Sequence, residues 1–137
     1  MIKLDSRKFS QEAYTALNAI VADTQDPYYL DKKYHKKASG VVQGLTAYIS
    51  TWGLHRLSGD AKKFLNGKAE DTKYKGKVYK KFLRSLKSFS GKNFNVDDEG
   101  SLLKMPLKEY TSLNRLAIEL AREWSFWASA VLGEPEE

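Results

Sequence analysis

The sequence of 137 residues has no cysteine, two histidines and three prolines. A chain without cysteine forms no disulfide, no thiolate metal site and no cysteine nucleophile, and such a composition is typical of the reducing cytoplasm. The two histidines, His35 and His55, have no carboxylates at the spacing of a metal site. We therefore predict no metal ion and no cofactor.

Catalytic and membrane motifs are also missing. No glycine-rich phosphate loop and no Gly-x-Ser-x-Gly elbow occurs. A single histidine among lysines, as at His35, is typically a surface residue, so we predict that the protein is not an enzyme. The alternative, a small enzyme that acts on RNA through His35 or His55, would lose cleavage when the histidine is replaced. No apolar segment has the length of a signal-peptide core or a membrane span, which predicts a soluble, cytoplasmic protein without a membrane partner.

Acidic residues are scarce in the middle of the chain. Residues 1–26 hold three basic and four acidic residues (net −1), residues 27–90 hold fifteen and four (net +11), and residues 91–137 hold five and nine (net −4), which gives the total of +6. A basic segment of this kind indicates a polyanionic partner, and the interleaved aromatic residues favour nucleic acid over a lipid surface. The acidic last third beside it favours head-to-tail stacking of copies of the chain.

Residues 73–89 contain no acidic residue and have the most distinctive pattern in the chain. At about 100° per residue, the stretch predicts a helix with two opposite faces. The apolar face consists of Val78, Phe82, Leu86 and Phe89, and the basic face of Lys73, Lys77, Lys80, Lys81, Arg84 and Lys87. We predict that the apolar face packs on the core and that the basic face stays open to bind an anion, because its like charges repel one another. Gly76 is expected to weaken the first turn.

A second basic helix is predicted from about residue 27 to residue 52, with Asp26 as the N-cap and Pro27 in the first helical position. Its lysines lie opposite its apolar residues and are Lys32, Lys33, Lys36 and Lys37. Gly40 and Gly44 fall near the lysine side. These glycines predict either a kink or a bare stretch of backbone where a phosphate backbone or a neighbouring subunit comes close.

Three further segments have helical periodicity. Residues 9–22 predict a first helix capped by Ser6 or Ser10, and a short helical segment follows the Trp-Gly bend in the middle of the chain. Residues 106–132 predict the helix at the centre of the core, because apolar residues recur along it at steps of three and four. These residues are Tyr110, Leu113, Leu116, Ala117, Leu120, Trp124, Trp127 and Val131.

No stretch alternates with the period of a strand, so the predicted fold class is all-α. We expect a compact bundle of four to six helices that forms a single domain over residues 1–137. Residues 90–105 are acidic and contain glycine, which predicts a flexible loop. Gly133 is expected to end the last helix, followed by a disordered acidic tail at residues 134–137.

Two segments have features in common with one family of small helical proteins. The last helix has a tyrosine near its start, a tryptophan, and an alanine four residues after the tryptophan, at Tyr110, Trp124 and Ala128. Residues 41–49 contain a Gly-Leu pair followed by an aliphatic residue, and the Gly-Leu pair at residues 53–54 is a second match to the same feature. Both segments look like the corresponding parts of that family.

Together with the basic character of residues 74–89, these segments make the chain, over about residues 28–132, similar to the small helical subunit of type III CRISPR effector complexes. The Cmr (type III-B) small subunit is the nearest likeness, and the Csm small subunit, which has the same role, is a close alternative. The resemblance implies an all-α, non-catalytic subunit that stacks with copies of itself along the guide–target RNA duplex in antiviral defence. Residues 90–105 have no counterpart in this family.

The basic pattern and the resemblance both predict a protein that binds the RNA backbone, because lysine and arginine faces contact phosphates whatever the base sequence. The predicted partners are guide RNA, the target RNA backbone, other CRISPR effector subunits and copies of the chain. The alternative is a free-standing helical DNA-binding factor of a phage or plasmid, in which a residue such as Gln43 would read base edges. The predicted phosphate contacts are Lys33, Lys36, Lys37, Lys77, Lys80, Lys81, Arg84 and Lys87.

Overall fold

The computed structural model describes residues 5–135, which form seven α-helices and one 3-10 turn and contain no strand. The prediction of an all-α fold is therefore confirmed, with more helices than the four to six expected. The elements are α1 (Ser6–Ala22), the 3-10 turn η1 (Lys32–Tyr34), α2 (His35–Gln43), α3 (Leu45–Trp52), α4 (Leu54–Asn66), α5 (Glu70–Ser90), α6 (Gly100–Leu103) and α7 (Leu107–Val131).

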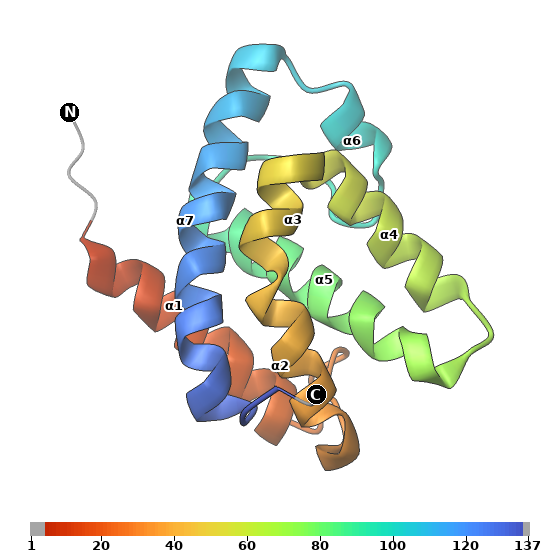
Figure 1. Ribbon diagram of the computed structural model, residues 1–137. Helices are drawn as coiled ribbons and strands as arrows, with labels where there is room; N and C mark the ends of the chain where they lie inside the picture. The colour runs from red at the N-terminus through yellow and green to blue at the C-terminus, as the bar shows by residue number, and fades with distance from the viewer. Residues whose placement is uncertain (1–4, 136–137) are drawn as a thin grey trace.

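The long helices α5 and α7 organise the bundle. In Figure 1, α7 runs along one side of the molecule, with α1 packed across its lower part and α2 and α3 packed beside it. Helix α4 packs along α5, and α5 in turn contacts α1, α2 and α7. Helix α5 is therefore covered from several directions, whereas η1 and the start of α2 lie at one end of the molecule (Figure 1).

The core lies where the apolar faces of α5 and α7 meet. Trp124 of α7 is fully buried, and its ring meets the ring of Phe82 edge to face, with the ring centroids 5.2 Å apart. Val78 and Leu86 of α5 are also fully buried, so the predicted apolar face of this helix is confirmed. Burying a side chain of this size contributes about 1.5–3 kcal/mol, and aromatic pairs prefer this edge-to-face geometry.

One extra helix arises because Gly44 divides the predicted second helix into α2 and α3, and the other is α6, which lies in the segment predicted to be a loop. Gly44 lies between the end of α2 and the start of α3, and Gly53, with a φ angle of +86°, lies at the Trp-Gly bend between α3 and α4. Glycine adopts this left-handed region without the steric cost that a side chain brings. The prediction that the helix begins at Pro27 is wrong. The backbone N–H of Leu30 donates to the carbonyl of Ile20 (2.9 Å). Residues 27–31 therefore pack against the end of α1 and do not form a helix.

The predicted cap of α1 is also wrong. The N-cap is Asp5, whose carboxylate accepts the backbone N–H of Arg7 (3.0 Å), whereas Ser10 donates its hydroxyl to Glu123 of α7 (2.7 Å). The end of α7 follows the prediction, because Gly133 has a φ angle of +99° and its N–H donates to the carbonyl of Ser129. The last two residues of the predicted disordered tail lie outside the described residues.

The segment between α5 and α7 is more structured than the predicted flexible loop. It contains α6, and three of its apolar side chains reach the core: Phe94, Val96 and Leu102 are 2%, 6% and 3% exposed. These anchors fix the segment against α5 and α4. Buried apolar side chains stabilise the packing of a loop as they stabilise that of a helix, because the favourable free energy comes from burying apolar surface and not from the local backbone conformation.

Gly76 has a different role from the weak point predicted in α5. It is buried where α4 crosses α5, and a Cβ atom at this position would lie 2.7 Å from the Leu65 Cγ atom and 2.9 Å from the Leu65 backbone nitrogen. The missing side chain therefore lets the two helices approach closely, which outweighs the low helix propensity of glycine.

Candidate nucleic-acid interface

The basic face of α5 is partly covered by the segment that follows it. Lys80 is only 7% exposed, and its ammonium group donates to the carbonyl of Val96 (2.8 Å) and to the Asp97 carboxylate (3.0 Å). The expectation that the whole basic face stays open is wrong for this residue. Its aliphatic stem packs in the protein while its charge is paired at the rim, which is the usual arrangement of a buried lysine.

A second acid covers the neighbouring lysine. Lys81 pairs with Asp26, and the two side chains are 18% and 9% exposed. The other carboxylate oxygen of Asp26 accepts the backbone N–H of Tyr28 (2.8 Å). Asp26 is therefore the anion that neutralises α5 here, and it does not cap a helix. Because this pair is largely removed from water, Lys81 is less available to an external phosphate than its position on the helix predicted.

Arg84 remains about half exposed although it has partners. Its Nε atom donates to the hydroxyl of Tyr28 (2.8 Å), and its guanidinium lies 3.7 Å from the Asp97 carboxylate. The hydrogen bond and ion pair with Lys80, together with the charges of Arg84 and Lys87, hold the pKa of Asp97 below its usual value. Asp97 is therefore an anion throughout the neutral range, set among three cations.

At the start of α5, residues from two distant parts of the chain form a hollow of about 290 Å³, which we name the tyrosine–lysine pocket. The ring of Tyr34 stacks on that of Tyr74 at an interplanar angle of 18°, and the ammonium group of Lys33 lies 5.2 Å from the Tyr34 ring centre. The ammonium group of Lys77 donates to the Tyr29 carbonyl (3.3 Å). The lining residues are Tyr29, Leu30, Asp31, Lys33, Tyr34, Lys73, Tyr74 and Lys77. Two predicted phosphate contacts, Lys33 and Lys77, thus meet at one site.

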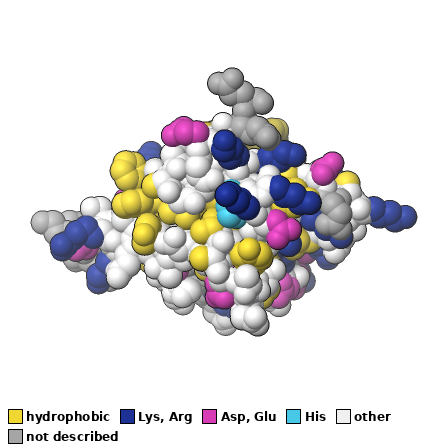
Figure 2. Space-filling view, turned by 90° about the horizontal axis from the view of Figure 1, so that it is seen from below, with side chains coloured by type: hydrophobic (Ala, Val, Ile, Leu, Met, Phe, Trp, Pro, Cys, Tyr) yellow, Lys and Arg dark blue, Asp and Glu magenta, His cyan; other side chains and the backbone are white. Residues whose placement is uncertain are grey.

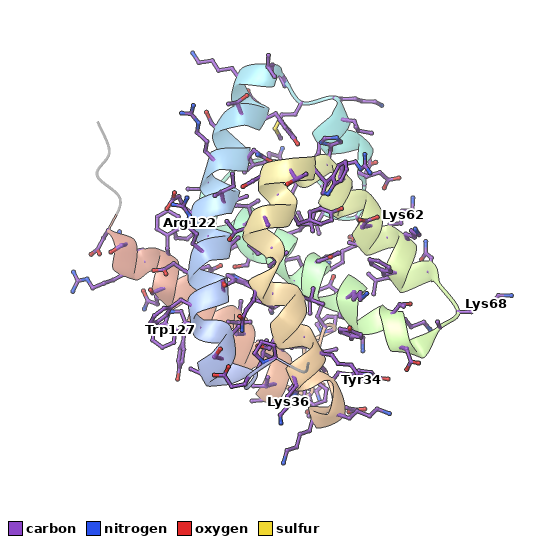
Figure 3. All side chains as sticks on the ribbon, in the orientation of Figure 1. Tyr34, Lys36, Lys62, Lys68, Arg122 and Trp127 are labelled. Carbon is purple, nitrogen blue, oxygen red and sulfur yellow. The ribbon has the colours of Figure 1, made fainter. Side chains whose placement is uncertain are left out.

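The predicted contacts Lys36 and Lys37 extend this pocket along the first turns of α2. Both side chains are exposed, and Lys36 lies beside Gly133 at the end of α7. Figure 2 views this end of the molecule and shows Lys and Arg side chains gathered over its centre and right, with fewer acidic side chains among them. Figure 3 shows Tyr34 and Lys36 at the same end. The basic residues here face solvent, so this end of the molecule attracts anions.

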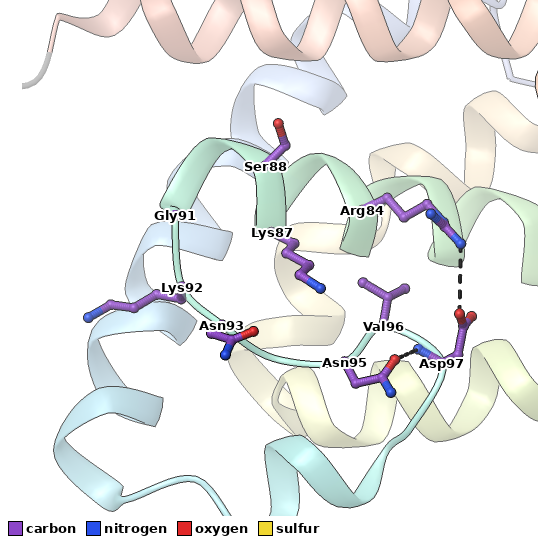
Figure 4. Close-up of a pocket in the computed structure, with 9 residues that line it drawn as sticks. All are labelled: Arg84, Lys87, Ser88, Gly91, Lys92, Asn93, Asn95, Val96 and Asp97. Carbon is purple, nitrogen blue, oxygen red and sulfur yellow. Dashed lines mark hydrogen bonds and ion pairs between the residues drawn. The ribbon is translucent and has the colours of Figure 1, made fainter.

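A second basic hollow, of about 450 Å³, lies where the chain leaves α5 (Figure 4), and we name it the α5–loop pocket. Gly91, with a φ angle of +69°, turns the chain out of the helix, and Lys87 points into the space between helix and loop. The side-chain oxygen of Asn95 accepts the backbone N–H of Asp97 (2.9 Å), which leaves the amide N–H groups of Asn95 as donors. The lining residues are Arg84, Lys87, Ser88, Gly91, Lys92, Asn93, Asn95, Val96 and Asp97.

The histidines and Gln43 make contacts within the fold. A ring nitrogen of His35 lies 2.9 Å from the carbonyl of Leu30, and a ring nitrogen of His55 lies 2.7 Å from the hydroxyl of Tyr110. The Gln43 amide donates to the hydroxyls of two serines. Among the side chains that the structure describes, no group of three metal-ligating residues comes together, and none of the described helices is both long and apolar enough to cross a membrane.

Sequence reasoning missed the tyrosines of the first pocket and the loop residues of the second. Tyr34 lies within a run of lysines, a signal for a site in which aromatic and basic groups meet, but the contact of Tyr34 with Tyr74 depends on the packing of α5. Sequence reasoning treated the segment that contains Lys92, Asn93 and Asn95 as an acidic loop because of its acidic residues, and did not include these three residues in a site.

Searches of protein-family models, of curated proteins and of solved structures return no match to this chain. Only the residues of the chain itself, and the pockets that they form, point to a function.

Proposed function

We propose that this protein is a non-catalytic, RNA-backbone-binding structural subunit of a type III CRISPR ribonucleoprotein. The observation that carries the proposal is the tyrosine–lysine pocket, in which Lys33 and Lys77 meet although 44 positions separate them in the chain, together with the exposed Lys36 and Lys37 beside it. The resemblance of residues 41–49 and of the last helix to the small subunit of these complexes gives the proposal its specific form.

The chemistry of this end of the molecule suits a phosphate backbone. Lysine is a compact charge that contacts phosphate without a fixed geometry, and several such contacts together bind a strand regardless of its base sequence. Asp31 is the one acid that lines the pocket, so lysines outnumber carboxylates there. A bound strand would relieve the repulsion among the exposed lysines, which no acid of the chain does at Lys36 or Lys37 within the described residues.

Exposed aromatic residues support the part of the proposal that concerns protein partners. Phe126 is 69% exposed and Tyr14 is 48% exposed, and both rings contact that of Trp127, with centroids 5.1 Å and 5.3 Å away. Clustered aromatic side chains are enriched at protein interfaces and cost free energy when they face water. A subunit held between neighbours in a larger complex would cover them.

Charge reversal tests the RNA contact. Replacing Lys33, Lys36 and Lys37 with glutamate should weaken binding of a fluorescently labelled single-stranded RNA about tenfold or more, measured by anisotropy. Because each lost phosphate contact lowers the salt dependence by about 0.7, the slope of log K against log salt should fall by about 2. The control is the same change of net charge at Lys104, Lys108 and Arg115, which are exposed elsewhere. Equal losses in both variants would mean that net charge alone binds RNA.

A pull-down tests the specific complex. The tagged full chain should recover larger RNA-binding subunits, together with short guide RNAs that share a repeat-derived end, from its native host at moderate salt. Mass spectrometry identifies the proteins and sequencing identifies the RNA. Recovery of the protein alone, or with heterogeneous DNA, would overturn the proposal in favour of the free-standing DNA-binding factor.

A further inference from the structure

The α5–loop pocket is lined by more cationic and amide side chains than carboxylates. Arg84 and Lys87 come from the helix, and Lys92, Asn93 and Asn95 come from the loop that turns back beside it (Figure 4). Asp97 is the one carboxylate that lines the pocket. Figure 4 shows Lys87 pointing into this hollow and Lys92 pointing away from it. Cations and amide groups that line one hollow are the groups that proteins use to hold a phosphate.

The existing contacts leave most of these groups available. Lys87 and Lys92 form no ion pair with the part of the chain that the structure describes. Arg84 lies 3.7 Å from Asp97, which is longer than the about 2.7–2.9 Å of a strong charged hydrogen bond. Arg84 therefore has a weak anionic partner that a better-placed anion could replace.

Asp97 is placed so that it can move without undoing the loop. Its side chain is 65% exposed, whereas that of Lys80 is 9% exposed. Lys80 also donates to the carbonyl of Val96, and the Val96 side chain is anchored in the core, so the loop stays fixed to α5 by contacts other than the carboxylate. The carboxylate can therefore turn away from Arg84 while the loop keeps its course.

We infer that the α5–loop pocket is a second binding site for a phosphate of the RNA backbone, and that Asp97 acts in it as a built-in competitor that the phosphate displaces from Arg84. Arg84 and Lys87 bind the incoming phosphate, the Asn93 and Asn95 amides donate hydrogen bonds to it, and Lys92 contacts the neighbouring part of the strand. This inference rests on the proposed function for the identity of the ligand, but the pocket can be tested separately.

The two basic pockets lie at different positions along α5. Lys77 lines the first and Lys87 the second, and ten residues of helix separate them, which corresponds to about 15 Å along the axis of α5. The buried pairs of Lys80 and Lys81 lie between the pockets and hold the helix in place.

The decisive variant is Asp97→Asn, because the amide oxygen of the substituted side chain still accepts from Lys80 while the competing charge is gone. RNA affinity measured by anisotropy should rise about fivefold, the effect of one unit charge a few ångströms from a phosphate in water. The matched control is Asp98→Asn, which changes the net charge equally at the adjacent residue. The Asp98 carboxylate accepts the Gly100 N–H (2.9 Å) and does not line the pocket. The control should raise affinity less than about twofold.

Replacing Arg84 tests whether the effect of Asp97→Asn on RNA affinity depends on the Arg84 guanidinium. In an Arg84→Gln background, the gain from Asp97→Asn should shrink to the gain from Asp98→Asn, because the competitor no longer has a cation to occupy. Lys87→Gln and Lys92→Gln should each weaken RNA binding and lower the salt slope by about 0.7. If Asp97→Asn and Asp98→Asn behave alike while the wild-type protein binds RNA, this inference is overturned and the proposed function stands.

A titration with inorganic phosphate separates the two proposals. Amide resonances of residues 91–97 should shift in nitrogen–proton correlation spectra of the wild-type protein, and the shifts should saturate at lower phosphate concentration in Asp97→Asn. If the wild-type protein does not bind RNA, yet these amides respond to phosphate, the proposed function fails and the anion site remains. If these amides do not shift, the α5–loop pocket is not a phosphate site.

Discussion

Two pairs of adjacent lysines look alike in the sequence and have opposite surroundings in the structure. Lys80 and Lys81 lie in the middle of α5 and are paired with Asp97 and Asp26, whereas Lys36 and Lys37 lie at the start of α2 and are exposed. Both pairs lie opposite apolar residues on a helix. Helical periodicity therefore gives the face on which a side chain lies, but not what covers that face.

The covering elements explain the difference. Helix α5 lies against the segment that precedes η1 on one side and the segment that follows Ser90 on the other, and each segment contributes an acid. The start of α2 lies at one end of the molecule (Figure 1), where no acid among the described residues pairs with Lys36 or Lys37. We expect Lys80 and Lys81 to act mainly on stability, and Lys36 and Lys37 mainly on binding.

The largest effect is predicted for Asp26→Ala. It leaves the ammonium group of Lys81 without its partner in a site that is 18% exposed, and it also removes the acceptor of the Tyr28 N–H. Leaving one member of a buried pair costs about 3–5 kcal/mol, so we expect the free energy of unfolding in urea to fall by about 3 kcal/mol. The double variant Asp26→Leu/Lys81→Met should recover most of this loss. A loss of less than about 1 kcal/mol in Asp26→Ala would show that water already screens the pair, as it does at the surface.

The next effect concerns the packing that covers α5. Gly76→Ala places a methyl group 2.7 Å from Leu65, so the free energy of unfolding should fall by about 1–3 kcal/mol. The control is Gly59→Ala in α4, where a Cβ atom meets nothing within 4 Å. At position 59, the better helix propensity of alanine should raise the free energy of unfolding by about 0.5–1 kcal/mol. Opposite signs in urea unfolding would confirm that close helix packing selects glycine at position 76; equal signs would contradict it.

Local patterns were sufficient for much of the fold. The recurrence of apolar residues at three and four positions gave the last helix almost to the residue, and the same period gave the buried face of α5, with Val78, Phe82 and Leu86 at its centre. Gly133 ended α7 as expected because its φ angle of +99° is favourable only for glycine. These features depend on neighbours within a few positions along the chain.

The surroundings of the basic residues were not predictable in this way. Asp26 reaches Lys81 across 55 positions and Asp97 reaches Lys80 across 17, and no periodic pattern encodes such pairs. The same holds for the start of the second helix, where burial of Tyr28 and Leu30 outweighed the N-cap and proline signals. Of the candidate site, the sequence could therefore predict which residues are basic and on which face they lie, but not which of them form pockets.

The smallest effect on stability is predicted for the double variant Lys36→Ala/Lys37→Ala. Both side chains are exposed and form no ion pair with the described residues, so the free energy of unfolding in urea should change by less than about 0.5 kcal/mol. RNA affinity should nevertheless fall, and the salt slope should decrease by about 1.4, because two phosphate contacts are lost. Asp26→Ala should instead lower the free energy of unfolding and leave RNA affinity, measured at a temperature where the variant is folded, without a loss, since the Lys81 charge remains. A loss of stability in the lysine variant would mean that the start of α2 is held by contacts of its lysines, and the contrast between the two helices would then be one of degree.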